Sequence, residues 1–256
     1  MSTTLPQRQR AVLPGALVPL ALAAATVLLQ IAYPLVHGHR RDLLTVGTVI
    51  CFFLASTSHA VVHRGPAWTA ALVTISAGIG LVVEAFGTAT GVPFGAYDYA
   101  GSLGAKIIGV PLVIPLAWAM FSYPSLLVGQ RLADSRLGAV LVGAAALASW
   151  DLFLDPQLVA AGHWHWRDVQ HALPGVPGIP VSNYLGWFLV ALVIMTLLQA
   201  LPRVAADDRQ PAALFLWTYV SSVVANAAFF GRPAVALIGG VGMGLVAGPY
   251  VRRLRR

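Results

Sequence analysis

Residues 84–106 read EAFGTATGVPFGAYDYAGSLGAK, and they stand out in a chain that is otherwise mostly apolar. The stretch begins with Glu84, the only glutamate of the protein, and runs through glycine, threonine and proline to Tyr97, Asp98 and Tyr99. Apolar segments normally exclude carboxylates, because a charged side chain is costly there. An acid near the end of such a segment, followed by a long glycine-rich loop, therefore indicates chemistry at this position.

The composition predicts an all-α, polytopic transmembrane helical bundle. Of the 256 residues, 58% are hydrophobic and 10% are charged, whereas a soluble domain carries about 25% charged residues. We expect one integral membrane domain over residues 1–256, with the lipid bilayer as a partner. The net charge of +7 is explained by topology and anionic lipid rather than by nucleic acid.

Apolar runs of about 20 residues can cross the hydrocarbon core as helices. Eight such runs are predicted, near residues 12–36, 42–62, 66–86, 107–128, 137–154, 182–201, 211–230 and 233–251. The fifth run is short, because Pro156 is expected to stop it, and the eighth is rich in glycine. Seven spans are therefore the alternative.

The positive-inside rule favours a cell-membrane protein with both termini in the cytoplasm. Arg8, Arg10 and the basic C-terminus then lie on the same side, although the Arg40-Arg41 pair opposes this orientation. Two predicted spans separate the two long loops, 87–106 and 155–181. Both loops therefore emerge on one face, whichever orientation the chain takes.

Helical spacing places Ser76, Gly80 and Glu84 on one face of the third predicted span, followed by Gly87. Small residues let another helix approach, so we expect Glu84 to point into the bundle. A carboxyl group there is protonated, paired or in a wet cavity. The functional interpretation is a proton donor, and the alternative is a structural acid that is hydrogen-bonded between helices.

Three aspartates accompany Glu84 at this face. Asp98 is either a turn-forming residue at the interface or a second acid that faces the same cavity, if the glycine loop folds back into the bundle. Asp151 and Asp155 are four residues apart and share a helix face. Ionising two carboxyl groups this close together costs free energy, so one of them is expected to hold a proton.

The second long loop contains His163-Trp164-His165-Trp166. A His-x-His pair near aspartates can bind zinc or iron, but the chain has no repeated histidine boxes, and we predict no metal. The tryptophans suit either an interfacial aromatic loop or a lid over an apolar substrate. Asn226 on the seventh predicted span either bonds to a neighbouring helix or reaches the cavity.

Several motifs, in this order, resemble the carotenoid biosynthesis membrane-protein family that includes the carotenoid hydratases. The resemblance covers roughly residues 70–190. The motifs are 84–91 (EAFGTATG), 93–99 (PFGAYDY), 111–118 (PLVIPLAW), 150–156 (WDLFLDP) and 178–187 (GIPVSNYLGW).

This resemblance implies a cofactor-free enzyme that adds water across a terminal C=C bond of an acyclic, lycopene-type carotenoid and gives a tertiary alcohol. Other enzymes of the pathway are possible partners.

Such hydration needs an acid, a base that takes a proton from water, and aromatic faces that stabilise the cation. Glu84 is the predicted acid and Asp151 the predicted base, with Asp98 and Asp155 as further acids or orienting groups. The roles can be exchanged. The predicted substrate contacts are Phe86, Tyr97, Trp150, Phe153, Trp164, Trp166 and Asn226.

Three other functions compete with hydration. A proton-coupled transporter predicts internal repeats with matched broken helices, and no convincing repeat is visible. A non-catalytic scaffold that holds a carotenoid would keep the aromatic residues and tolerate loss of the acids. A metal-dependent oxygenase would take its hydroxyl oxygen from O₂ rather than from water.

Overall fold

The computed structural model describes residue 15 and residues 17–256. Within these residues, eight helices are long and apolar enough to cross a membrane, which confirms the predicted bundle and favours eight spans over seven. The predicted start of the first span, and Arg8 and Arg10, lie outside the described residues. The helices are α1 (Leu17–Ala32), α2 (His39–Arg64), α3 (Pro66–Thr90), α4 (Val113–Leu132), α5 (Arg136–Ala160), α6 (Val181–Leu198), α7 (Arg209–Val224) and α8 (Pro233–Leu254).

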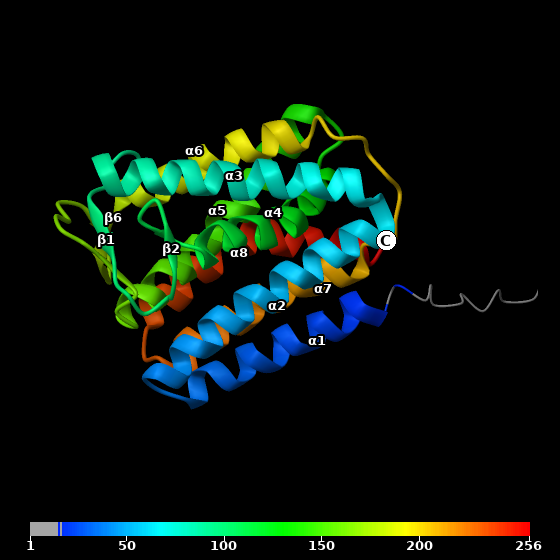
Figure 1. Ribbon diagram of the computed structural model, residues 1–256. Coiled ribbons are helices and arrows are strands. Elements are labelled where there is room, and N and C mark those ends of the chain that lie inside the picture. Colours follow the sequence, from blue (N-terminus) through cyan, green and yellow to red (C-terminus); the bar gives the residue numbers. More distant parts are fainter. Residues whose placement is uncertain (1–14, 16) are drawn as a thin grey trace, which may run out of the picture.

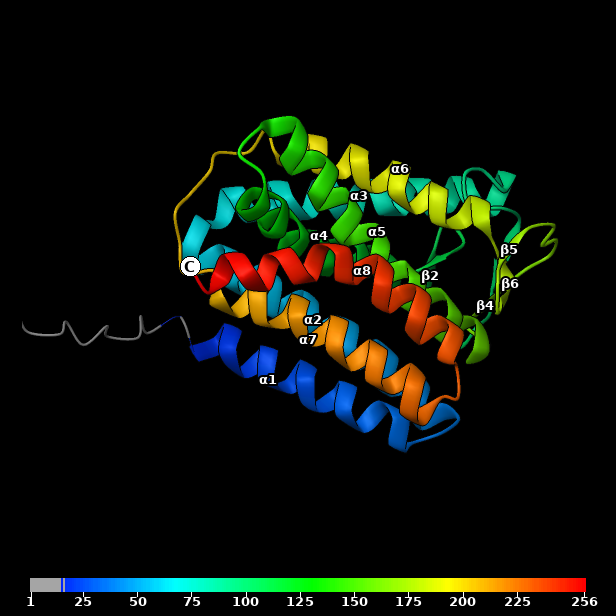
Figure 2. The ribbon, with the colours of Figure 1, turned by 180° about the vertical axis from the view of Figure 1, so that it is seen from behind.

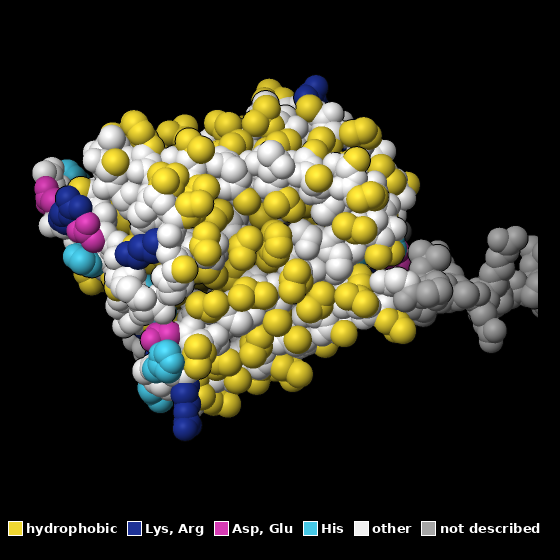
Figure 3. Space-filling model, viewed as in Figure 1, with side chains coloured by type: hydrophobic (Ala, Val, Ile, Leu, Met, Phe, Trp, Pro, Cys, Tyr) yellow, Lys and Arg dark blue, Asp and Glu magenta, His cyan; other side chains and the backbone are white. Residues whose placement is uncertain are grey.

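The helices run side by side, and α4 lies in the middle of the bundle (Figure 1). Nearly all of α4 is buried, whereas the outer helices α1 and α3 each bury only a minority of their residues. Apolar side chains cover the middle of the face seen in Figure 3, and charged side chains gather mainly at one end. This distribution fits a multi-pass membrane protein.

The described residues contain six short strands, in the segments between α3 and α4 and between α5 and α6. They lie at that charged end (Figure 1). β1 (Tyr97–Tyr99) pairs antiparallel with β4 (Trp164–Trp166), so the prediction that both loops emerge on one face is confirmed. β2 (Lys106–Ile107) pairs with β3 (Val110–Pro111), and β5 (Ala172–Leu173) pairs with β6 (Val176–Pro180). The C-terminus and the start of α1 lie at the opposite end (Figure 2).

The fifth span is longer than predicted. Proline in a helix interior removes one hydrogen bond and usually kinks or ends the helix. Pro156 nevertheless lies inside α5, which continues to Ala160. The flanking side chains Asp155 and Leu158 are buried, and Arg232 donates to the Pro156 carbonyl over 3.2 Å. Tertiary packing therefore holds this last turn in place, and the prediction that Pro156 stops the helix is wrong.

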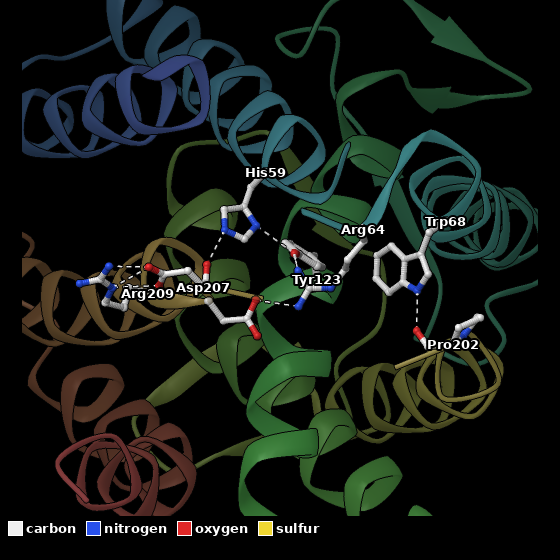
Figure 4. A network of polar contacts seen from close by, with 8 residues as sticks. His59, Arg64, Trp68, Tyr123, Pro202, Asp207 and Arg209 are labelled. Carbon is white, nitrogen blue, oxygen red and sulfur yellow. Dashed lines mark hydrogen bonds and ion pairs between the residues drawn. The ribbon is translucent and has the colours of Figure 1, made fainter. Parts of the chain in front are cut away.

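A polar network fastens the opposite end of the bundle (Figure 4). Arg64, at the end of α2, is buried, donates to the Tyr123 hydroxyl over 2.5 Å and forms an ion pair with Asp208 at 2.6 Å. His59 bonds to the same hydroxyl over 2.9 Å and to the Asp207 carbonyl over 3.0 Å. These contacts tie α2 and α4 to the connection between α6 and α7, far from the strands.

Candidate active site

A cavity of about 150 Å³ lies within the bundle. Its wall includes residues of α1 to α7 and of β1 and β4. Most of the lining side chains are apolar or aromatic. Two acids, Glu84 and Asp155, also line it. The two predicted acidic clusters therefore meet at one cavity, although they are far apart in the sequence.

Glu84 points into the bundle, as its spacing predicts. It is 4% exposed and lies on the buried face of α3 together with Ser76 and Gly80. A Cβ at Gly80 would lie 2.7 Å from the indole ring of Trp118. Only glycine therefore lets this tryptophan of α4 lie against α3, beside Glu84.

Three hydrogen-bond donors surround the carboxyl group of Glu84. The Tyr99 hydroxyl donates to Oε2 over 2.7 Å, the Tyr97 hydroxyl donates to the same oxygen, and Trp118 Nε1 donates to Oε1 over 3.0 Å. Burial raises the pKa of both tyrosine hydroxyls. Both hydroxyls therefore keep their protons and remain available as donors to Glu84.

The pairing of β1 with β4 explains how the two tyrosines reach Glu84. Successive side chains of a strand point to opposite faces. Tyr97 and Tyr99 therefore share one face, and their partners across the ladder are Trp166 and Trp164. All four side chains line the cavity. The tryptophans form an inner wall rather than an exposed interfacial loop.

The same alternation contradicts one predicted position. Asp98 lies between the tyrosines and points to the outer face, opposite His165. Its carboxylate pairs with the guanidinium of Arg167, with hydrogen bonds of 2.6 and 2.5 Å. Arg167 lowers the pKa of Asp98. Asp98 is thus an ionised surface residue, and the prediction that it faces the cavity of Glu84 is wrong.

Asp151 and Asp155 form the second acidic group. Asp151 is 0% exposed and Asp155 is 3% exposed. The amide nitrogen of Asn183 on α6 donates to Asp151 Oδ2 over 2.8 Å and also donates to Asp155 Oδ2. Trp164 Nε1 donates to Asp155 Oδ1 over 3.2 Å. Asp155 faces the cavity, whereas Asp151 lies one turn earlier on α5, beyond the cavity lining.

Asp151 Oδ1 is buried and has no hydrogen-bond partner among the described residues. The two carboxyl groups therefore have fewer donors than Glu84 has alone. Only Asn183 and Trp164 donate to the two carboxyl groups, which leaves room for a retained proton on the pair.

The predicted substrate contacts divide into two groups. Five of them line the cavity: Tyr97, Trp150, Phe153, Trp164 and Trp166. Phe86 does not, because it lies two residues after Glu84, about 200° around the helix, and its side chain is 53% exposed on the outer surface. That predicted position is wrong.

Asn226 is buried in a π-helical turn, η3 (Ala225–Phe229), that follows α7. Its amide donates to the Ser222 carbonyl over 3.0 Å. Ser222 and Ala225 form the cavity wall there. Asn226 is not among the residues that line the cavity, and its Oδ1 is buried without a hydrogen-bond partner in the described part of the chain. Its contact with substrate stays a prediction.

The sequence did not single out four residues of this site: Tyr99, Trp118, Asn183 and Trp187. The rings of Trp118 and Trp187 stack at 4.0 Å and form part of the wall. Asn183 falls at the start of the predicted span 182–201, where a polar side chain is ordinary for a helix start, and α6 does begin at Val181. All four lie within the motifs of the family resemblance, which is the signal that could have identified them.

His163 and His165 do not converge. His165 is exposed on the outer face of β4, whereas His163 is buried and bonds to the Ser102 hydroxyl over 2.8 Å. No group of three histidine, cysteine or acidic side chains within the described part of the chain is arranged to hold a metal ion.

Fold and cavity together define a multi-pass membrane protein with buried acids in an aromatic-walled site. The family model described as "Carotenoid biosynthesis protein" matches residues 43–250, and the chain belongs to that family. The chain is also 33% identical over 140 residues to the bisanhydrobacterioruberin hydratase of Haloarcula japonica. That match covers 49% of this chain and 46% of the relative, so it spans about half of each protein. No solved structure matches the chain.

Proposed function

We propose that this protein is a carotenoid hydratase that adds water across a terminal C=C bond of an acyclic carotenoid end and gives a tertiary alcohol. The observation that carries the proposal is that two acidic groups with different hydrogen-bond donors meet at one aromatic cavity. Alkene hydration needs one group to give a proton and another to take one. Family membership and the hydratase relative support this chemistry.

The hydrogen bonds favour one assignment of the two roles. Donors that point at a carboxyl group stabilise its ionised form. Glu84 receives three donors, whereas Asp151 and Asp155 together receive two, the shared amide of Asn183 and the indole N–H of Trp164. We therefore assign the proton to the aspartate pair, with Asp155 as the member that faces substrate, and the base to Glu84. This assignment exchanges the roles favoured by the sequence.

In the reaction, the proton on Asp155 is transferred to the less substituted carbon of the terminal double bond. The π electrons form the new C–H bond and leave a tertiary carbocation. A water oxygen then attacks that carbon, and Glu84 accepts a proton from the attacking water. Return of this proton to the aspartate pair restores the enzyme. The sum is the addition of one water molecule, and no oxidant or reductant is needed.

The aromatic wall suits the intermediate. A carbocation is attracted to the negative faces of aromatic rings. Trp150, Phe153, Trp164 and Trp187 line the cavity with Asp155. A polyene that is dissolved in the bilayer can present one end to the site between helices, while the rest of it stays in lipid.

The distribution of basic residues supports an orientation. The end of α4, the start of α5, the connection between α6 and α7 and the C-terminus lie opposite the strands (Figure 1). These segments carry Arg131, Arg136, Arg203 and the C-terminal arginines. By the positive-inside rule, we propose that both termini face the cytoplasm and that the strands, with the site below them, face the other side of the cell membrane.

Pigment analysis tests the proposal. The gene is expressed in cells that accumulate lycopene, beside an empty vector and the Asp155→Asn variant. The wild-type protein is expected to yield monohydroxy or dihydroxy lycopene derivatives, and neither control is expected to do so. If the wild-type protein retains unmodified pigment through purification and forms no alcohol, the protein is a carotenoid-binding scaffold and not a hydratase.

A further inference from the structure

The part of the cavity wall that α1, η2 (Tyr33–Leu35) and α2 form is rich in polar side chains. Gln30, Tyr33, Thr45 and Thr48 line it, together with the apolar Pro34 and Val49. The four polar side chains are uncharged. Polar side chains in the wall of a mostly apolar and aromatic cavity need a reason, because buried polar groups cost free energy unless they are hydrogen-bonded.

Tyr33 is the first observation. Its side chain is 7% exposed, and its hydroxyl is buried without a hydrogen-bond partner among the described residues. The ring is held in place, because it meets Phe230 edge-on at 6.1 Å and lies under the guanidinium of Arg41 at 5.3 Å. The hydroxyl is therefore fixed in the cavity wall rather than free to seek a partner.

Thr48 is the second observation. The hydroxyl of a threonine in a helix usually donates a hydrogen bond to the carbonyl group one turn earlier. Thr26 and Thr45 do so, with bonds of 2.8 and 3.1 Å. Thr48 does not, and its buried Oγ1 has no partner in the described part of the chain.

We propose that this wall is a binding subsite for a neutral O–H group. The Tyr33 hydroxyl can donate to the ligand oxygen, and Thr48 Oγ1 can accept its proton. An anion is disfavoured because none of the four lining side chains is charged. The O–H group is either a water molecule held for the reaction or a hydroxyl already carried by the polyene end.

The inference rests on the proposed function for both sources of the ligand, and it is tested with three variants. Tyr33→Phe and Thr48→Val remove the two hydroxyls with little change of shape. Thr26→Val is the matched control, because Thr26 is buried on α1, bonds to its own helix and does not line the cavity. Each protein is given lycopene and a lycopene derivative that carries a tertiary hydroxyl at one end.

Loss of one neutral hydrogen bond is expected to lower turnover about threefold to tenfold. An equal loss with both substrates in Tyr33→Phe and Thr48→Val assigns the subsite to water. A loss with the hydroxylated substrate alone assigns it to the substrate hydroxyl. Turnover of both substrates that matches the Thr26→Val control overturns the subsite and leaves the hydratase proposal intact.

If the wild-type protein hydrates neither substrate, the hydratase proposal fails and the same proteins are compared by retention of the two pigments after purification. A preference for the hydroxylated pigment that is lost in Tyr33→Phe supports the subsite. Equal retention in all proteins overturns it.

Discussion

Asp151 and Asp155 share one hydrogen-bond donor, the amide nitrogen of Asn183 on the neighbouring helix. Both carboxyl groups are buried, and two buried acids at this spacing repel each other if both are charged. The amide of Asn183 and the indole N–H of Trp164 donate to the pair, and one retained proton would remove the repulsion. Under the proposed mechanism, this pair on α5 supplies the proton for the reaction, and Asn183 of α6 positions it.

Replacing Asn183 with leucine is expected to destabilise the protein by about 1–3 kcal/mol, because buried carboxyl oxygens lose their donor. The measurement is thermal unfolding in detergent. Ser182→Ala is the control, since Ser182 is exposed on the same turn of α6 and should change the free energy of unfolding by less than about 0.5 kcal/mol. Equal stability of Asn183→Leu and the control would contradict the shared-donor interpretation.

The assignment of acid and base predicts different behaviour of two variants in D₂O. Glu84→Gln still has the proton of the aspartate pair, so it is expected to protonate the alkene reversibly and to exchange deuterium into recovered polyene without hydrating it. Asp155→Asn is expected to do neither. Hydration should fall roughly 100-fold to 10,000-fold in both variants.

Mass spectrometry of the recovered polyene measures this exchange. Deuterium in the polyene from Asp155→Asn, with none from Glu84→Gln, would restore the roles that the sequence favoured.

Asp98→Asn is expected to keep hydration within about twofold of wild type, because its carboxylate points away from the cavity and pairs with Arg167. Arg167 lowers the pKa of Asp98. The contribution of this ion pair to the free energy of unfolding is therefore fully present above the ordinary aspartate pKa of about 3.9. It is lost only as the pH falls through the lowered value. Product yield at neutral pH is the measurement, and a loss as large as that of Asp155→Asn would place Asp98 in the site after all.

Gly80→Ala tests the packing that places Trp118 beside Glu84. The added Cβ would lie 2.7 Å from the indole ring, so either the ring or the helix must move, at a cost of typically 1–3 kcal/mol. Hydration is expected to fall with stability, because Trp118 donates to Glu84. Gly78→Ala is the matched control on the same helix, since its added Cβ meets nothing within 4 Å. Alanine forms helices better than glycine does, so Gly78→Ala is expected to keep or slightly raise stability. Similar losses in both variants would show that the loss does not come from contact with Trp118.

Much of the fold followed from composition and hydropathy. Eight apolar runs predicted eight spans, and counting them placed both long loops on one face, as the pairing of β1 with β4 confirms. The end of α5 could not be predicted, because contacts from α8 and its preceding residue, Arg232, outweigh the local effect of Pro156.

Less of the site was predictable. The small residues around Glu84 indicated correctly that it points inward. The direction of Asp98 depends on strand pairing between loops that are about 70 residues apart, which a single sequence does not reveal. Asn183 resembled a helix start, and only the approach of α6 to α5 turns its amide toward two acids.

The source of the product oxygen tests the central claim most directly. Membranes that contain the protein are incubated with lycopene in H₂¹⁸O under argon, and the pigment is analysed by mass spectrometry. A hydratase is expected to form a tertiary alcohol without O₂ and to incorporate one ¹⁸O per hydroxyl group. An alcohol that forms only when O₂ is admitted, with its oxygen taken from O₂, would contradict hydration.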